Sequence, residues 1–172
     1  MSYIIEKDWI TPAGLRAIII ICEHQGRKTH RCGYVGVSAG CCLYKKSYHE
    51  QVLEILQEQV ADLTLGKRGV LLALTATVGA DTEGLIRRSP DVLFDVHGGL
   101  TYSGGGEAST YPVTSDLWWF GFDCRHVGDA AIEPDLQYSD FNEGVVRDLP
   151  YVTAECESLA QQIEDFLAGA CS

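Results

Sequence analysis

The sequence predicts an α+β protein of one domain, with a mostly antiparallel sheet and two main helices packed on it. A β-branched run is followed after a short polar turn by an alternating segment, and two later segments have helical periodicity. No repeat or linker divides the 172 residues, so residues 1–172 are expected to share one core. With 46% hydrophobic and 22% charged residues, a chain of this length needs no cofactor for stability.

The first strand is expected at residues 15–22, after Pro12 and Gly14, and residues 30–37 are expected to be its hairpin partner. In residues 91–97, Val92, Phe94 and Val96 alternate with more polar positions, which favours another strand. Further strands are expected at residues 70–78, 100–103 and 117–124.

Two helices are expected to cover the sheet. Ser47 and Glu50 have the spacing of a capping box, and the apolar positions after them predict a helix over residues 48–64 that ends before Gly66. The second helix is expected over about residues 150–168, with Gly169 as its stop. Its apolar stripe consists of Val152, Cys156, Leu159, Ile163, Phe166 and Leu167. Cys156 is therefore expected to be a core residue.

The net charge of the chain limits the classes of partner that it is expected to bind. A formal charge of −11 disfavours broad binding to nucleic acid and to anionic membranes, although a few Arg and His side chains could still hold a small anionic ligand. The longest apolar run, residues 17–22, is too short to span a membrane, which predicts a cytoplasmic protein. Seven cysteines without a CxxC motif favour reduced thiols. A homo-oligomer is compatible with the sequence.

Two segments hold most of the polar groups suited to chemistry. If residues 91–97 and 117–124 are neighbouring strands, their Asp, His and Arg side chains meet at one sheet edge, beside Gly-rich turns and aromatic rings. Such a group suits a nucleotide-like ligand, because rings stack on a base and donors bind phosphate or ribose. The expected ligand-binding residues are Asp95, His97, Gly98, Gly99, Tyr102, Trp118, Asp123, Arg125, His126 and Asp129.

The same residues allow three interpretations. His97, Cys124, His126 and Asp129 could bind a divalent metal such as zinc, although their spacing matches no zinc motif. Cys124 could have a lowered pKa beside Arg125 and His126 and act as a nucleophile, or the imidazole groups could serve in acid/base chemistry. In the third interpretation, the carboxylates and histidines form an internal polar network.

Three phrases resemble one family of small proteins encoded by tailed bacteriophages and prophages. They are HRCGYVGV at residues 30–37, DVHGGLTYSG at 95–104 and WWFGFDCRHVGD at 118–129. The resemblance runs from about residue 9 to about residue 165 and implies a phage accessory protein that acts in the bacterial cytosol. It brings no established catalytic residues. Where relatives tend to have Pro-Gly-His-Pro, this chain has Ser38-Ala-Gly-Cys-Cys-Leu.

Three functions follow as hypotheses. The first is a phage-encoded protein that sequesters a small nucleotide-derived ligand, such as a host immune second messenger, because small phage accessory proteins often counter host defence. The alternative is a metal-dependent or acid/base hydrolase of a nucleotide-like substrate that uses the same cluster. A second alternative is a protein-binding inhibitor, which should expose an apolar patch.

Overall fold

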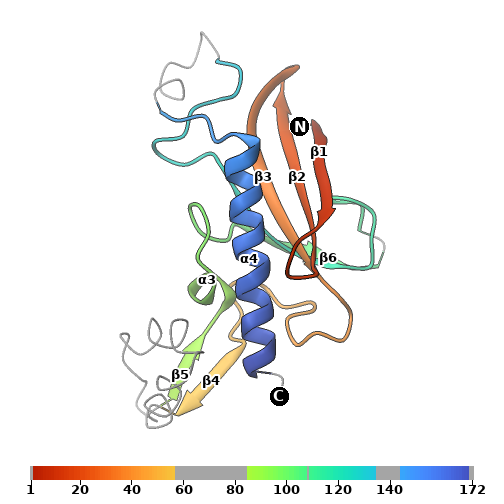
Figure 1. Ribbon diagram of the computed structural model, residues 1–172, viewed down its shortest axis with the longest axis vertical. Helices are drawn as coiled ribbons and strands as arrows, with labels where there is room; N and C mark the ends of the chain where they lie inside the picture. Colours follow the sequence, from red (N-terminus) through yellow and green to blue (C-terminus); the bar gives the residue numbers. More distant parts are fainter. Residues whose placement is uncertain (1, 57–84, 108, 135–143, 171–172) are drawn as a thin grey trace.

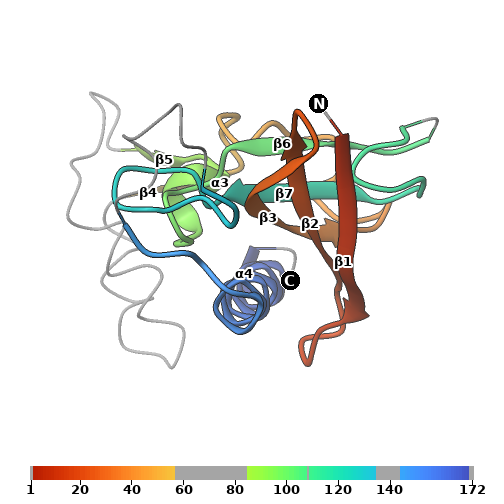
Figure 2. The same ribbon diagram turned by 90° about the horizontal axis from the view of Figure 1, so that it is seen from above.

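The computed structural model describes residues 2–56, 85–107, 109–134 and 144–170. Over these residues the chain forms a five-stranded antiparallel sheet that one long helix covers on one face (Figures 1 and 2). The expected α+β class with an antiparallel sheet is confirmed. Among the described helices, none has the length and apolar composition needed to cross a membrane.

The sheet has the strand order β1-β2-β3-β7-β6. Its strands are β1 (Ser2–Ile10), β2 (Arg16–His24), β3 (Arg27–Val37), β6 (Tyr102–Gly105) and β7 (Trp118–Asp123). The predicted hairpin of β2 and β3 is present, and Gln25 and Gly26 form its turn with φ of 51° and 75°. Positive φ at both central residues is typical of the tight turn that matches the twist of the two strands.

The apolar run in β2 is explained by a core on both faces of the sheet. Ala17 and Ile19 point toward the helix side and join Val35 and Phe120 there. Ile18 and Ile20 point to the opposite side, into a second cluster with Cys22, Cys32, Tyr34 and Trp119. Because β2 is buried on both faces, its sequence is continuously apolar rather than alternating.

Helix α4 (Leu149–Ala170) lies alongside β3 in Figure 1 and supplies the main helical layer. The predicted stripe is confirmed for Val152, Cys156, Leu159 and Ile163, which are fully buried, and for Phe166 at 4% exposure. Gly33 on β3 permits close approach, since a Cβ there would lie 2.6 Å from Sγ of Cys156. The helix and the sheet are therefore fitted to each other at this glycine.

The helix expected over residues 48–64 is wrong at its start. Residues 53–56 form strand β4 (Leu53–Leu56), which pairs with β5 (Leu85–Arg88) in a separate two-stranded sheet. Residues 57–64 and the strand expected at 70–78 lie outside the described residues. Ser47 and Glu50 do make capping contacts, because the amide of Ser47 donates to Oε2 of Glu50 and the hydroxyl oxygen of Ser47 accepts from the amide of His49. The capping pattern in the sequence thus corresponds to a local contact, but the chain after it continues as strand β4 and not as a helix.

The strand expected at residues 91–97 is also wrong. Pro90–Leu93 form the short helix α3, and residues 94–97 are irregular chain rather than part of the sheet. Pro90 suits the first turn of a helix, and Asp91 stabilises that turn's N-terminus. The expected alternation fails as well, since Val92 is exposed and Leu93 is buried. Asp95 and Asp123 therefore do not lie on neighbouring strands.

Strand β1 was not predicted because its sequence carries three consecutive charges at Glu6, Lys7 and Asp8. The pairing of β1 with β2 shifts register between Ile5 and Lys7, so Glu6 lies at an irregularity of the edge strand. Its carboxylate binds Arg31 of β3 at 2.6 Å. Charge and an irregular register are common on edge strands, which must avoid pairing with other chains.

Candidate functional site

His97 is held where the irregular chain after α3 meets the first half of α4. Its backbone amide donates to Oε2 of Glu155 at 2.7 Å. The next two residues, Gly98 and Gly99, turn the chain with φ of 68° and 85°. Because this left-handed conformation favours glycine, the sequence places the turn directly after His97. The imidazole is thereby directed toward the loop that follows β7.

Asp129 is the centre of the polar cluster. Its side chain is 2% exposed, and Oδ2 accepts hydrogen bonds from Nε2 of His97 at 2.8 Å and from the backbone amide of His126 at 2.9 Å. The other oxygen, Oδ1, accepts from Nε of Arg147 at 2.8 Å. A buried carboxylate requires such partners, and here three donors meet one side chain.

These contacts fix the orientation of the His97 ring. Since Asp129 is an acceptor, Nε2 of His97 carries the proton, which leaves Nδ1 as the acceptor of the neutral ring. Nδ1 lies 3.1 Å from the hydroxyl of Tyr151, which donates to it. Asp129, His97 and Tyr151 thus form a continuous hydrogen-bonded chain.

The electrostatics keep the ends of this chain in defined protonation states. Burial raises the pKa of Asp129, but hydrogen bonds from Arg147, the amide of His126 and His97 outweigh burial and hold that pKa below its ordinary value. Burial and the nearby Glu155 raise the pKa of Tyr151. At neutral pH Asp129 is therefore a carboxylate, while Tyr151 keeps its proton and remains a donor.

An open cavity of about 290 Å³ adjoins the cluster. His97 and Tyr151 form one part of its wall, so two members of the hydrogen-bonded chain are accessible from it. Its lining residues are Asp95, Val96, His97, Tyr151, Glu155 and Ser158. Among the described residues, two carboxylates and no Lys or Arg line this cavity.

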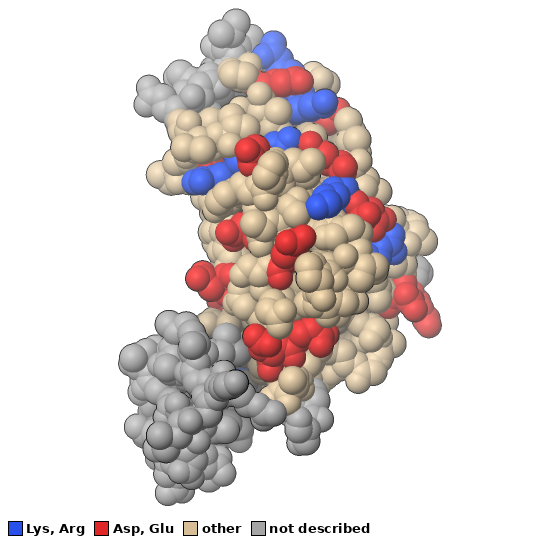
Figure 3. Space-filling model, in the orientation of Figure 1, with Lys and Arg blue, Asp and Glu red and all other residues tan. Residues whose placement is uncertain are grey.

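The charge around the cavity follows from α4, which carries Glu155, Glu157, Glu164 and Asp165 and no Lys or Arg. Figure 3 looks onto the face that holds α4 and shows the blue basic groups in its upper half, mixed with acidic groups, and mainly acidic groups below them. Arg147 approaches from the preceding loop, with its guanidinium carbon 4.9 Å from the ring centroid of Tyr151. Arg147 thus brings a positive charge next to Tyr151 in the cavity wall.

His126 packs against the His97 ring, with ring centroids 5.5 Å apart. Its Nδ1 is buried and has no hydrogen-bond partner in the described part of the chain, and the carboxylate oxygens of Asp129 and Asp123 lie 3.8 Å and 3.9 Å away. Gly98 covers the same ring so closely that a side chain there would overlap it. Of the expected site residues, the structure brings together His97, Gly98, His126 and Asp129, with Asp123 close to His126 and Asp95 at the cavity.

The other expected ligand-binding residues lie elsewhere. Tyr102 packs on the opposite face of the sheet, against Tyr34 and Tyr111. Trp118 lies at the opposite end of β7 from Asp123, and its Nε1 donates to the backbone carbonyl of Lys46. Arg125 is exposed and its side chain does not line the cavity. Gly99 forms the turn, and no atom crowds it.

Cys124 does not have the character expected of a nucleophile. It is 3% exposed, and it belongs to the apolar cluster under α4. Burial, together with the negative charges of Asp129 and Asp123, raises the pKa of its thiol to about 12. The expected lowering by Arg125 and His126 is therefore wrong, because Cys124 points into the core while those side chains lie in the loop.

A metal ion at this cluster would need rearrangement. Donor atoms of His97, His126 and Asp129 lie within 4.8 Å of one another, whereas Cys124 is not part of this group. However, both oxygens of Asp129 already accept hydrogen bonds, and Nε2 of His97 is one of the donors. The observed geometry is that of a carboxylate-oriented imidazole, which is suited to proton transfer or to hydrogen bonding of a ligand.

The sequence patterns did not identify Tyr151, Glu155 and Arg147 as site residues. Tyr151 and Glu155 are four residues apart, so they lie on one face of the predicted final helix, and this spacing was the available signal. Arg147 precedes the helix in an irregular segment, and no pattern in the sequence connects it to Asp129.

Comparison with known proteins yields no relative: no family model, curated protein or solved structure matches this chain.

Proposed function

We propose that the protein binds a small nucleotide-derived ligand in the cavity beside His97. The observation that carries this proposal is that the cavity wall contains an imidazole whose orientation is fixed by the buried Asp129. An oriented donor and acceptor at a cavity wall confers specificity, because the ligand need not order it. Tyr151 adds a protonated hydroxyl and an aromatic ring to the same wall.

The lining residues indicate which part of such a ligand enters the cavity. Asp95 and Glu155 accept hydrogen bonds, so they suit the hydroxyl groups of ribose or the amino group of a base. Phosphate groups would be repelled by these carboxylates and would lie toward Arg147. That guanidinium uses Nε for Asp129 and has further N–H groups suited to an anion. We therefore expect an anionic ligand whose uncharged part, the ribose or the base, enters the cavity.

The biological setting is proposed from the sequence resemblance. A phage accessory protein in the cytosol of an infected bacterium that sequesters a nucleotide second messenger would suppress a host immune signal. A phage that lacks the gene should then plate less efficiently on hosts with such signalling, and equally well on hosts without it. The matched phage carrying His97→Gln separates ligand binding from the mere presence of the protein.

The direct test is calorimetric titration with a panel of nucleosides, cyclic nucleotides and ADP-ribose derivatives. At least one ligand should bind, and Glu155→Gln should weaken it by about tenfold, the scale of one hydrogen bond to a charged group. Glu157→Gln is the matched control, because it removes the same charge from α4 at a residue that does not line the cavity. If no ligand binds, or both variants weaken binding equally, the proposal fails. A protein-binding role at β1, where Ile4 and Ile10 are exposed, would then be favoured.

A hydrolase is the second candidate, and the chain of Asp129, His97 and Tyr151 favours it. Asp129 can stabilise a protonated His97, and Tyr151 can pass a proton between His97 and a molecule in the cavity. Chromatography of the ligand after incubation distinguishes the two functions. Unchanged ligand released by heat denaturation indicates sequestration, whereas a product that accumulates with time, and does not with His97→Gln, indicates hydrolysis.

A further inference from the structure

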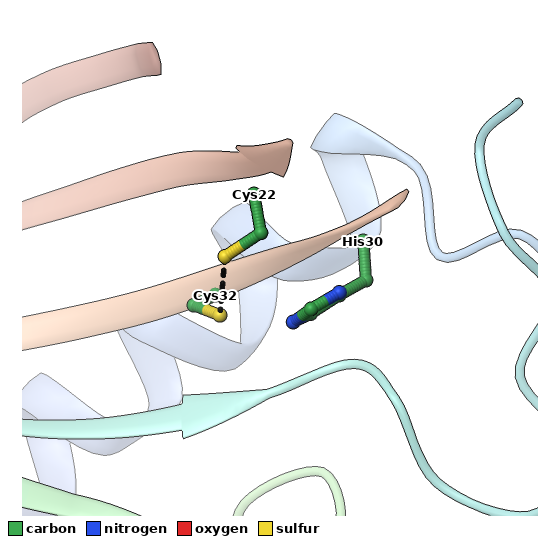
Figure 4. A group of neighbouring side chains, drawn as sticks. All are labelled: Cys22, His30 and Cys32. Carbon is green, nitrogen blue, oxygen red and sulfur yellow. Dashed lines mark hydrogen bonds between the residues drawn. The ribbon is translucent and has the colours of Figure 1, made fainter. Parts of the chain in front are cut away.

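A second cluster of chemically active side chains lies on the sheet face opposite α4, away from the cavity. Cys22 on β2 and His30 and Cys32 on β3 offer donor atoms that all lie within 4.8 Å of one another. Both cysteines are buried, with exposures of 6% and 5%. Figure 4 shows the two sulfur atoms adjacent and the imidazole of His30 extending toward them.

From this geometry we infer that Cys22, His30 and Cys32 bind a zinc ion. Two thiolates and one imidazole, with water in the fourth position, form a ligand set that zinc uses in proteins. The sulfur atoms lie 3.6 Å apart. Two sulfurs that each lie about 2.3 Å from a tetrahedral metal would be about 3.8 Å apart, so the observed spacing needs little adjustment.

The register of the hairpin explains why these three side chains share one face. Cys22 lies directly opposite His30, and Cys32 lies opposite Ile20, so the cysteines are diagonal neighbours on adjacent strands. Asp123 lies opposite Cys32 on β7 and adds a negative charge on the same face. These positions depend on strand pairing, since no CxxC spacing brings them together in the sequence.

Thr29 fixes which nitrogen of His30 is available to a metal. The hydroxyl of Thr29 donates its single proton to the carbonyl of Cys22 at 2.9 Å. Its oxygen therefore accepts the proton of Nδ1 of His30, which lies 3.0 Å away. The Nε2 lone pair of the neutral ring is then free of a proton, and an outer hydrogen bond of this kind is the usual way in which a zinc-binding histidine is oriented.

A disulfide is a less suitable use of the same cysteines. Diagonal neighbours on adjacent strands have Cα atoms about 7–8 Å apart, whereas disulfides usually require about 4.4–6.8 Å. A disulfide would also make no use of Nε2 of His30, which the hydrogen bond to Thr29 leaves unprotonated. Binding of zinc requires only that each thiol lose its proton to solvent, so that two thiolates balance the charge of the buried ion.

The test titrates the reduced full chain with Co²⁺ and then with Zn²⁺. We expect one Co²⁺ per chain with thiolate-to-cobalt absorption, which Zn²⁺ then abolishes by displacement. Cys22→Ser and Cys32→Ser should remove the absorption, whereas Cys42→Ser should retain it, because Cys42 lies outside the cluster. Thr29→Val should weaken zinc binding by about 10- to 100-fold, as expected for loss of an orienting hydrogen bond.

Two measurements keep the result clear if a cysteine variant fails to fold. Native mass spectrometry of the unmodified chain should show the mass of one zinc ion gained and two protons lost. The double variant His97→Gln and His126→Gln should bind Co²⁺ as the unmodified chain does, because this proposal is independent of the ligand cavity. The inference is overturned if the reduced chain binds no metal, if Cys22→Ser retains the absorption, or if the double variant loses it.

Discussion

Gly98 lies against the imidazole of His126 so closely that no side chain fits between them. Its φ of 68° is a second reason for glycine at this position. The turn after His97 and the loop after β7 are therefore packed together at a residue that has no side chain. This contact places His126 beside His97 and leaves its Nδ1 buried.

Gly98→Ala should therefore displace His126 and lower both stability and ligand affinity. Gly99→Ala is the matched control: Gly99 has a φ of 85°, but no atom lies within 4 Å of a Cβ placed there. The control should lose about 1 kcal/mol of stability, which is the cost of placing a residue with a Cβ at positive φ. Gly98→Ala should lose clearly more. Urea unfolding of both variants measures the difference, and equal losses would show that the contact with His126 is unimportant.

The lowered pKa of Asp129 predicts a specific dependence of stability on pH. A carboxyl with a pKa below its unfolded value of about 4 stabilises the fold above that value, and this contribution is lost as pH falls through the folded pKa. Asp129→Asn cannot titrate and leaves Arg147 without its carboxylate. The variant should be less stable at neutral pH, and its deficit should shrink below about pH 4. A deficit that stays constant down to about pH 2 would contradict the assignment.

Glu6→Gln tests whether the edge strand supports the site. Arg31 donates two hydrogen bonds to Glu6 and a third, from Nη1, to the backbone carbonyl of Arg147. Loss of the charge on Glu6 should cost about 1–2 kcal/mol and loosen Arg147, because the pair is largely shielded from solvent. Asp8→Asn is the control, since the pair of Asp8 with Arg16 is more exposed and should contribute less than about 1 kcal/mol.

Unfolding in denaturant gives both costs, and ligand affinity reports on Arg147. If Asp8→Asn lowers the free energy of unfolding as much as Glu6→Gln does, burial of the Glu6–Arg31 pair does not increase its contribution to stability. If Glu6→Gln changes stability alone, then β1 supports the fold without supporting the cavity.

The sequence predicted an element best where the signal for that element lies within the segment itself or in its immediate neighbour along the chain. Strands β2 and β3 are joined by a two-residue turn, and α4 has an apolar stripe that continues over most of its length. The helix expected from Ser47 and Glu50 failed for the opposite reason. The capping turn forms, but pairing with β5 draws residues 53–56 into a strand, and a local pattern cannot reveal that distant partner.

The candidate site was predicted in part for a similar reason. His97, His126 and Asp129 could be grouped from residue type and proximity to glycine turns. Arg147 and Glu155 could not, because the contacts that bring them to Asp129 and to the amide of His97 arise only when α4 docks on the sheet. The sequence did not show on which face of its strand Tyr102 lies. Its ring packs with Tyr34 on the sheet face opposite α4, away from the cavity.

Cys156 provides the last prediction, which concerns the fit of α4 to the sheet. It is fully buried, and its Sγ occupies the space above Gly33. Cys156→Ala should cost about 1 kcal/mol and leave ligand affinity unchanged, because the shortened side chain leaves only a small gap. Gly33→Ala should cost more, since the added methyl would lie 2.6 Å from both Sγ of Cys156 and Cζ of Phe122.

The double variant decides whether these two residues fit each other directly. Cys156→Ala should recover part of the stability that Gly33→Ala loses, because it removes one of the two side chains that the added methyl would overlap. Phe122 remains in the way, so the recovery should be incomplete. Thermal unfolding of the two single variants and the double variant measures the coupling. Strictly additive losses would mean that the helix shifts as a unit to relieve the overlap, and that Cys156 does not itself set the distance between α4 and β3.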